Sequence, residues 1–258
     1  MPSLISAHIE KTGGTSLYRA YKEIYGPEKV FLYFPQSDTV APAIADRLSG
    51  STTIIDVLKS AVSKTFLYPH LYPQVIKIRK LISDNHSAEQ LPPGFGVVHG
   101  HFQTNRFDHL VGEGAVRSIV LRNPLERMIS HYERWKRTRG QDLSRLFVQY
   151  NKNMSFEQFS LLPRMQNYQA GFLAGKDLKE FYIVGVTERL DEFGTNLQKV
   201  LAFSKRINIA HLNQSPPLSF VSPQDLPNKF IREFEDYHQI DYDLYNQALN
   251  ISMRTGFL

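Results

Sequence analysis

A lysine followed by small residues, directly after an apolar run, is the first group in this sequence that could do chemistry. The group consists of Lys11, Thr12, Gly13, Gly14, Thr15 and Ser16. Residues 3–9 before it favour a strand, and the apolar residues after it recur at helical spacing. A helix that begins in such a turn offers backbone N–H groups and a positive dipole end, to which the lysine adds a cation. The combination indicates a binding site for a phosphate.

The order of residues in this turn differs from the phosphate loop of nucleoside triphosphatases. That loop has the pattern GxxxxGK[ST], whereas here Lys11 precedes the glycines and the turn is shorter. On this segment alone, a plain strand-to-helix turn with a solvated lysine is the alternative interpretation.

A second cationic segment lies in the middle of the chain. Residues 116–121 indicate a buried strand, and the Asn-Pro pair at 123–124 begins a helix that extends to about residue 136. Arg122 leaves the strand end, and Ser130 lies about two helical turns further along. These two side chains could hold one anion between them. Alternatively, Arg122 forms a capping salt bridge and Ser130 lies on the helix surface.

Two histidines end another short apolar run. Residues 96–101 indicate a buried strand, with His99 near its end and His101 at its carboxyl end. A neutral imidazole can remove a hydroxyl proton near neutral pH, because the ordinary pKa of histidine is about 6.5. The alternative is that His99 is a satisfied core histidine and His101 an ordinary loop residue.

Strands alternate with helices along the whole sequence. Further strands are expected at 30–34, 181–186 and 207–212, and further helices at 188–203, 224–236 and 241–251. This alternation predicts one α/β domain over residues 1–258 with a central, mostly parallel sheet flanked by helices. Ligands of such sheets bind at the carboxyl ends of the strands.

The composition of the chain excludes several kinds of functional site. The chain has 258 residues, of which 42% are hydrophobic, and it contains no cysteine. Disulfides, thiolate zinc sites, iron–sulfur clusters and a cysteine nucleophile are therefore excluded. The apolar runs are too short for a membrane-spanning helix, and the net charge of +5 suggests an anionic ligand.

The two anion-binding segments together resemble the nucleotide-binding segments of sulfotransferases that use 3′-phosphoadenosine 5′-phosphosulfate (PAPS). The matching stretches are HIEKTGGTSL and VLRNPLERMISHY. The resemblance implies a single P-loop-like domain in which the turn from Lys11 to Ser16 binds the 5′-phosphosulfate. It also implies that Arg122 and Ser130 hold the 3′-phosphate of this co-substrate.

The segment VVHGH is similar to the HGH segment of the carbohydrate sulfotransferases, in particular the heparan sulfate and uronyl 2-O-sulfotransferase branch. This similarity implies that His101 is the base, that His99 supports it, and that the acceptor is a hydroxyl group of a carbohydrate. A weaker likeness downstream implies that Asn213 and Ser215 contact the nucleotide. Lys11 would stabilise the leaving group.

Two residues depart from the family's pattern. Glu10 stands where proline is common, and Asn123 stands where aspartate is common. The sequence also begins almost at the first strand, without the anchor and stem of animal Golgi members. We therefore expect a bacterial cytoplasmic enzyme or an excised Golgi-lumenal catalytic domain.

Other functions remain open on the sequence. Residues 52–56 form an apolar run that ends in Asp56, which could hold magnesium in a P-loop-like nucleotide kinase or phosphotransferase, although a solvated helix carboxylate is the simpler interpretation. We expect no metal site, since a sulfuryl group carries little charge of its own. A non-catalytic glycan- or nucleotide-binding module is a third hypothesis.

The basic run at residues 133–139 contains Trp135 and four cations. It could bind an anionic glycan through ion pairs and ring stacking, or it could be an ordinary basic helix end favoured by the helix dipole. Nucleic acid is not an expected partner, because no nucleic-acid-binding motif accompanies the cations. His131, next to Ser130, is expected to be a packing residue.

Overall fold

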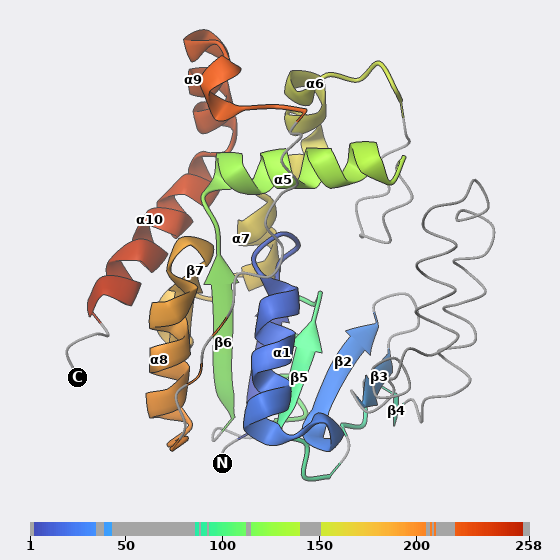
Figure 1. Ribbon diagram of the computed structural model, residues 1–258, viewed down its shortest axis with the longest axis vertical. Helices are drawn as coiled ribbons and strands as arrows, with labels where there is room; N and C mark the ends of the chain where they lie inside the picture. Colours follow the sequence, from blue (N-terminus) through green and yellow to red (C-terminus); the bar gives the residue numbers. More distant parts are fainter. Residues whose placement is uncertain are drawn as a thin grey trace.

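Seven strands form one sheet in the order β4-β3-β2-β5-β1-β6-β7 (Figure 1). The computed structural model describes residues 3–34, 39–42, 86–87, 89–91, 93–111, 115–139, 151–204, 207, 209 and 220–254. The strands are β1 (Leu4–His8), β2 (Val30–Phe34), β3 (Thr39–Pro42), β4 (His86–Ser87), β5 (Val97–Gly100), β6 (Val116–Leu121) and β7 (Ile183–Val186).

Five neighbouring strands of the sheet are parallel. β2 and β1 both pair in parallel with β5, β6 pairs with β1 on its other side, and β7 pairs with β6. β3 is antiparallel to β2, and β4 is antiparallel to β3. The mostly parallel sheet expected from the sequence is confirmed. Parallel strands end at a common edge, so residues that follow β5, β1 and β6 meet there.

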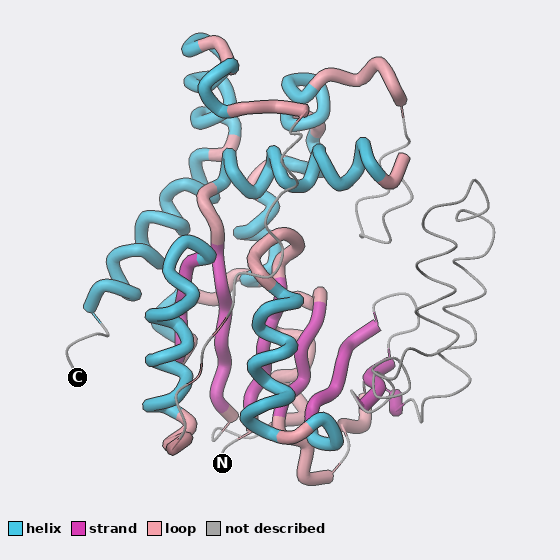
Figure 2. The backbone as a smooth tube through the Cα atoms, in the orientation of Figure 1, coloured by secondary structure: helices cyan, strands magenta, loops and turns pink. Residues whose placement is uncertain are grey.

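Helices lie on both faces of the sheet and across its carboxyl edge (Figures 1 and 2). The α-helices are α1 (Gly14–Tyr25), α5 (Pro124–Arg137), α6 (Phe156–Ser160), α7 (Tyr168–Leu173), α8 (Leu190–Val200), α9 (Asn228–Tyr237) and α10 (Gln239–Arg254). The 3-10 helices are η1 (Pro27–Lys29), η3 (Pro163–Met165), η4 (Leu178–Glu180), η5 (Thr187–Arg189) and η6 (Pro223–Asp225).

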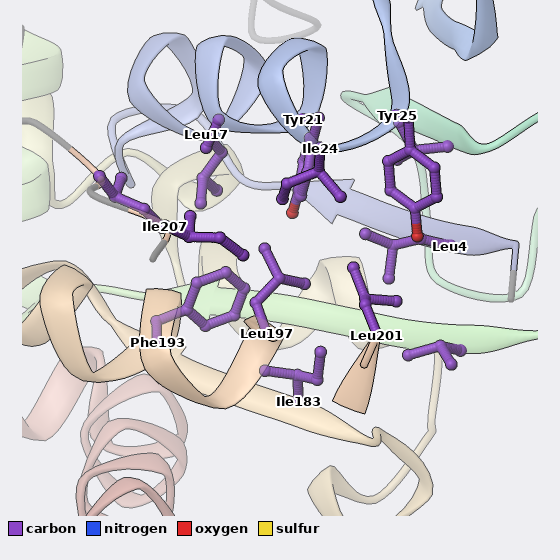
Figure 3. Close-up of a cluster of buried hydrophobic side chains, with 14 of the residues drawn as sticks. Leu4, Leu17, Tyr21, Ile24, Tyr25, Ile183, Phe193, Leu197, Leu201 and Ile207 are labelled. Atoms are coloured by element: carbon purple, nitrogen blue, oxygen red, sulfur yellow. The ribbon is translucent and has the colours of Figure 1, made fainter. Parts of the chain in front are cut away.

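One face of the sheet is covered by α1 and α8. Leu17 and Tyr21 of α1 pack with Phe193 of α8 against strand residues such as Leu4 and Ile183 (Figure 3). The apolar residues of α1 lie on one side because they recur every three to four positions. This packing holds the first turn of α1 beside the end of β1.

The opposite face is covered by α7 and α10. Ile119 and Val184 point to this side and pack against Phe172 of α7 and Ala248 of α10. In β6, Val116 and Val120 belong to the first cluster, whereas Ile119 belongs to the second, as expected when side chains alternate along a strand. β6 is therefore buried on both faces of the sheet, although it also contains Arg117 and Ser118.

A third group of helices lies over the carboxyl edge of the sheet. Figure 1 shows α5 crossing above β6 and α1, with α6 and α9 beyond it. An aromatic cluster that includes Tyr132, Phe159 and Phe234 joins these three helices. These helices therefore form a cap over the strand ends that the sequence marks as the candidate site.

Most expected elements are present with small shifts at their ends. The strand expected at 116–121 is found with those bounds, and the helix after it ends at Arg137. Of the strand expected at 207–212 the structure describes only Ile207 and Ile209, both buried. Asp56 and the two weaker nucleotide contacts, Asn213 and Ser215, lie outside the described residues. None of the helices in the described ranges is long and apolar enough to cross a membrane.

Candidate active site

The candidate residues come together at the ends of three adjacent strands. β1 ends at His8 and leads into the turn of Lys11, while β6 ends at Leu121 and leads into Arg122. On the other side of β1, β5 ends at Gly100, so His101 follows directly. In the register of the sheet His8 lies beside Val120, which places these endings at one edge. The strand ends followed by Lys11, His101 and Arg122 are therefore neighbours at one edge of the sheet.

The turn between β1 and α1 has two residues in the left-handed region. Lys11 has a φ of 74° and Gly13, the N-cap residue of α1, has a φ of 86°. Glycine adopts this conformation without penalty, whereas lysine does so rarely. Such a conformation costs about 1–3 kcal/mol and is commonly found at functional sites. The strained residue here is the one expected to contact the phosphosulfate.

The first turn of α1 carries no acidic residue, and Gly13 provides no side-chain cap. The positive end of the helix dipole is therefore not compensated by the helix's own residues. Thr15 and Ser16, both predicted to contact the donor, lie in this first turn, and Ser16 is buried. The helix start has the polarity expected of an anion site.

Gly14 is required because His8 occupies the space beside it. A Cβ atom on Gly14 would lie 2.0 Å from Nε2 of His8, closer than any real contact allows. The ring of His8 thus packs directly under the helix start. Gly13 is less crowded, since a Cβ there would lie 3.2 Å from Leu190.

Thr12 shapes the turn from inside. Its side chain is fully buried, and both its N–H and its hydroxyl donate to the carbonyl oxygen of Ile9, at 3.3 and 2.9 Å. Its hydroxyl also lies 3.4 Å from Nδ1 of His8. Both hydrogen-bond donors of Thr12 are therefore used within the turn. We infer that Thr12 stabilises the conformation of this turn.

Arg122 contacts the first motif directly. Its Nη1 donates to the carbonyl oxygen of Lys11 at 3.3 Å, and its Nη2 lies 3.6 Å from a carboxylate oxygen of Glu126, one turn along α5. The Arg122 side chain is about three-quarters buried, with 23% of it exposed. A guanidinium carries five donors, so these contacts leave capacity for an anion.

The main chain of Arg122 is held by Gln169 of α7. The Gln169 side chain accepts from the N–H of Arg122 at 2.9 Å and donates to its carbonyl oxygen at 2.8 Å. Gln169 is fully buried. Asp241 of α10 in turn accepts from the N–H groups of Gln169 and Ala170, at 3.0 and 2.8 Å. Burial raises the pKa of Asp241. α7 and α10 therefore fix the backbone from which Arg122 extends.

α5 begins at Pro124, and Asn123 is its N-cap residue. The side-chain oxygen of Asn123 accepts from the N–H groups of Leu125 and Glu126, at 3.1 and 3.2 Å. Asn123 is thus a working N-cap of α5. Ser130 follows two turns later and is buried, with 7% exposure.

His101 has a defined orientation. Its Nδ1 lies 2.8 Å from the carbonyl oxygen of His8. A carbonyl can only accept, so Nδ1 carries the proton and Nε2 of the neutral ring keeps its lone pair. The side chain is 36% exposed. Nε2 is therefore the atom able to take a proton from a bound hydroxyl group.

His8 and His99 form a buried stack beneath His101. The ring of His8 lies 4.6 Å from that of His101 and 5.2 Å from that of His99. Burial, followed by the charge of His101, lowers the pKa of His8 well below its ordinary value, and the same causes lower the pKa of His99 to about 3. Nδ1 of His99 lies 3.0 Å from the hydroxyl of Ser6, which meets that of Tyr21 at 2.9 Å. Both rings are uncharged supports at neutral pH.

Glu10 and Arg127 are charged groups buried beside these residues. Tyr168 lies between them: its hydroxyl donates to Oε2 of Glu10, and the Arg127 guanidinium stands 4.6 Å from its ring centre. Glu10 is 7% exposed and Arg127 1%. Burial lowers the pKa of Arg127. Neither residue is among the site residues expected from the sequence.

Three residues of the site were missed by the sequence interpretation. His8 lies inside the first motif, and its role arises from the ring stack with His99 and His101. Glu10 was noticed only as a departure from proline. Gln169 lies in a six-residue helix with no motif. The one available signal in the sequence was a polar residue inside a motif, and this signal applied to His8 and Glu10.

The basic end of α5 does not offer its tryptophan to a ligand. Trp135 is 3% exposed and packs against Tyr132 and Phe159. Lys136 donates to the carbonyl oxygen of Lys152 at 2.7 Å. The ring-stacking interpretation of this run is wrong, because the indole belongs to the aromatic core under the cap. His131 is buried and packs near Phe159, as expected.

Within the described ranges no group of three or more histidine, cysteine, aspartate or glutamate residues is arranged to hold a metal ion.

No protein-family model matches this chain, and no curated protein matches its sequence. Among solved structures, it is similar to a sulfotransferase from Alicyclobacillus acidocaldarius, with 14% identity, a TM-score of 0.43 and 96% of each chain covered. It is also similar to retinol dehydratase in complex with androsterone and the inactive cofactor PAP, with 12% identity, a TM-score of 0.41, and 93% of this chain and 80% of that chain covered.

Proposed function

We propose that this chain is a sulfotransferase that moves a sulfuryl group from PAPS to an acceptor hydroxyl group. The observation that carries the proposal is the contact between the two anion-binding segments: Nη1 of Arg122 lies 3.3 Å from the carbonyl oxygen of Lys11. One ligand with phosphates at both ends can therefore bridge the helix start of α1 and the strand end of β6.

The donor would bind with its two anionic ends on different elements. Lys11 and the first turn of α1 would take the 5′-phosphosulfate, because they combine a cation with an uncompensated helix dipole. Arg122 and Ser130 would take the 3′-phosphate, and Asn213 and Ser215 are proposed as further nucleotide contacts. Arginine suits a terminal phosphate because its planar fork can donate two parallel hydrogen bonds.

The transfer step would use His101 as the base. The acceptor oxygen forms a bond to sulfur while the bond between sulfur and the bridging oxygen breaks, and its electron pair remains on the 5′-phosphate. The acceptor proton passes to Nε2 of His101, whose Nδ1 proton is already held by the carbonyl of His8. Lys11 stabilises the negative charge that develops on the leaving group.

We propose a carbohydrate hydroxyl as the acceptor. The support is the likeness of His99-Gly100-His101 to the HGH segment of carbohydrate sulfotransferases, together with the position of His101 directly after β5. We expect transfer to need no added metal, because the sulfuryl group carries little charge of its own. A labelled-sulfate transfer screen over sugars, polysaccharides, tyrosine, lipids and small phenols tests the acceptor class.

Thermal unfolding with ligands tests the donor. The product nucleotide, 3′-phosphoadenosine 5′-phosphate (PAP), at a hundredfold excess over its Kd should stabilise the protein by about 2.7 kcal/mol. Adenosine triphosphate with magnesium should stabilise it far less. If only the triphosphate with magnesium stabilises the chain, the kinase hypothesis replaces this proposal.

A base variant separates an enzyme from a binding module. His101→Ala should keep its affinity for PAP and lose about 10²–10⁴-fold in transfer rate. His109→Ala is the matched control, since His109 is exposed and pairs with Glu89 away from the site. If His101→Ala transfers sulfate at the rate of the unaltered chain, His101 is not the base.

A further inference from the structure

Glu10 is a buried acidic residue that the proposed chemistry does not yet use. It stands two residues after the end of β1 and is 7% exposed. Its Oε2 accepts from the hydroxyl of Tyr168, whereas its Oε1 is buried without a hydrogen-bond partner among the described residues. Burial of a carboxylate oxygen without a hydrogen bond costs free energy, so an electrostatic interaction is needed to offset that cost.

The group nearest to that unpaired oxygen is the proposed base. Oε1 of Glu10 lies 3.8 Å from Nδ1 of His101. This distance is too long for a hydrogen bond but short enough for a strong interaction between charges. The Nδ1 proton is donated instead to the carbonyl oxygen of His8 at 2.8 Å. Glu10 thus faces the end of the ring opposite to Nε2.

Glu10 is not placed to act as the base itself. Its free oxygen has no exposed surface, whereas the His101 side chain is 36% exposed. An acceptor hydroxyl can therefore approach the imidazole but not this oxygen. Its effect on the reaction must be exerted through His101.

We infer that Glu10 is a positioning residue that stabilises the positive charge His101 acquires in sulfuryl transfer. The inference rests on the function proposed above. When the acceptor oxygen bonds to sulfur and the bridging oxygen leaves, the proton passes to Nε2 of His101. The ring then carries one positive charge, 3.8 Å from the Glu10 oxygen. Glu10 neither gains nor loses a proton in this step.

The other groups around His101 do not supply this negative charge. His8 and His99 from β1 and β5 are kept uncharged by burial, which lowers the pKa of each. His131 from α5 is uncharged for the same reason, with the charge of Arg127 as a further cause of its lowered pKa. Glu10 is the carboxyl group within ion-pair distance of His101 in the described part of the chain.

Two cations, Arg127 and Lys11, lie near Glu10. The Arg127 guanidinium lies over the ring of Tyr168, whose hydroxyl holds Oε2 of Glu10. The buried cation of Arg127 is thus close to the Glu10 side chain. Lys11, next in the chain to Glu10, belongs to the donor site and would be neutralised in part by the phosphosulfate.

A purely structural role is the competing explanation. Glu10 could simply anchor the turn after β1 to Tyr168 of α7. Glu10→Gln distinguishes the two, because glutamine keeps the size of the side chain and an oxygen for the Tyr168 hydroxyl but removes the charge. Glu192→Gln is the matched control, since Glu192 is an exposed residue of α8 paired with Arg189 at 3.9 Å.

The test follows the His101 ring by proton NMR over a pH titration of the full chain. The His101 signal is identified by its loss in His101→Gln. In Glu10→Gln the midpoint of this titration should fall, because the variant removes the carboxylate that lies 3.8 Å from the ring. Glu192→Gln should leave the midpoint in place. An unchanged midpoint in Glu10→Gln overturns the inference.

A second variant covers the case in which Glu10→Gln does not fold. Glu10→Asp keeps the charge, but its side chain is one methylene shorter, so the charge lies further from His101. The midpoint of the His101 titration should therefore fall by less than in a neutral variant. A midpoint equal to that of the unaltered chain would contradict the inference.

PAP binding to the same proteins separates this inference from the proposed function. The unaltered chain and Glu10→Gln should bind PAP with equal affinity in calorimetry, because Glu10 faces the base. If PAP does not bind the unaltered chain, the proposed function fails, whatever the titration shows. If PAP binds and the midpoint does not move, only the role of Glu10 fails. In a transfer assay, Glu10→Gln should lower kcat and leave the KM for PAPS unchanged.

Discussion

The guanidinium of Arg122 donates a hydrogen bond to the main-chain carbonyl oxygen of Lys11 at 3.3 Å, although 111 positions separate the two residues in the chain. This contact joins the end of β6 to the turn after β1. It also ties the cation to the residue whose left-handed conformation shapes the phosphate turn. The two motifs are thus in direct contact at the carboxyl edge of the sheet.

Removal of either cation should weaken nucleotide binding. Lys11→Ala and Arg122→Ala each remove charge-assisted hydrogen bonds to a phosphate, worth about 1.5–3 kcal/mol. The expected result is a loss of about 10- to 100-fold in PAP affinity by calorimetry. Lys229→Ala on the exposed face of α9 is the control and should bind as the unaltered chain does. Unchanged affinity in both variants would refute the assignment of the donor site.

Loss of the two hydrogen bonds between Gln169 and the main chain of Arg122 should affect the same site indirectly. Gln169→Met keeps the side-chain volume but leaves the N–H and carbonyl of Arg122 without their buried partner. An unpaired buried polar group costs about 1–3 kcal/mol. We expect lower stability in urea unfolding together with weaker PAP binding, because Arg122 loses its fixed backbone.

The exposed Gln247→Ala on α10 is the control for both measurements. If Gln169→Met loses stability but binds PAP normally, Gln169 supports the fold and does not position Arg122.

The sequence predicted the elements whose pattern is local. β6 was expected with its observed bounds because it is an apolar run between a polar segment and an Asn-Pro pair. α5 was expected because proline and an N-cap residue mark its start. Both motifs follow strands with such local patterns, so both could be assigned to strand ends. The region of the candidate site was therefore predictable.

The sequence could not predict contacts that depend on the order of strands in the sheet. His8 meets His99 and His101 because β5 pairs with β1, and no local pattern specifies that pairing. Gln169 reaches Arg122 from a helix of six residues, too short for a periodic signal. The burial of Trp135 could not be predicted either, because it packs against Phe159 of α6, which comes later in the chain.

Protonation of His238 should make the stability depend on pH. Its Nε2 lies 3.0 Å from the carbonyl oxygen of Ser160, and its Nδ1 accepts from the N–H of Asn167 at 3.3 Å. Burial lowers the pKa of His238 to about 4. The unfolded chain, with an ordinary pKa near 6.5, binds more protons between these values. Stability from this residue is complete above about pH 6.5 and is lost as the pH falls toward 4.

Urea unfolding between pH 7 and pH 5 measures this dependence. One such group contributes a slope of about 1.4 kcal/mol per pH unit within the window. His238→Gln should be less stable at pH 7 but should have a smaller slope, whereas the exposed His109→Gln should keep the slope. A slope that His238→Gln leaves unaltered would show that other buried histidines account for the loss.

Filling the space at Gly14 should disturb the site through His8. A Cβ atom there would lie 2.0 Å from Nε2 of His8, and that ring is held between His99 and His101. Overpacking of this kind costs about 1–3 kcal/mol. Gly14→Ala should therefore lose stability and PAP affinity together. Gly171→Ala is the control, because a Cβ atom at Gly171 of α7 has no neighbour within 4 Å.

The double variant decides whether His8 is the cause. His8→Ala removes the ring that the new methyl group would strike, so Gly14→Ala should cost less in that background than in the unaltered chain. Residues in contact show such coupling, whereas independent sites add. If the two losses of stability simply add, the clash lies elsewhere and His8 does not set the shape of the phosphate turn. Coupling would instead tie the glycine of the motif to the histidine stack that supports His101.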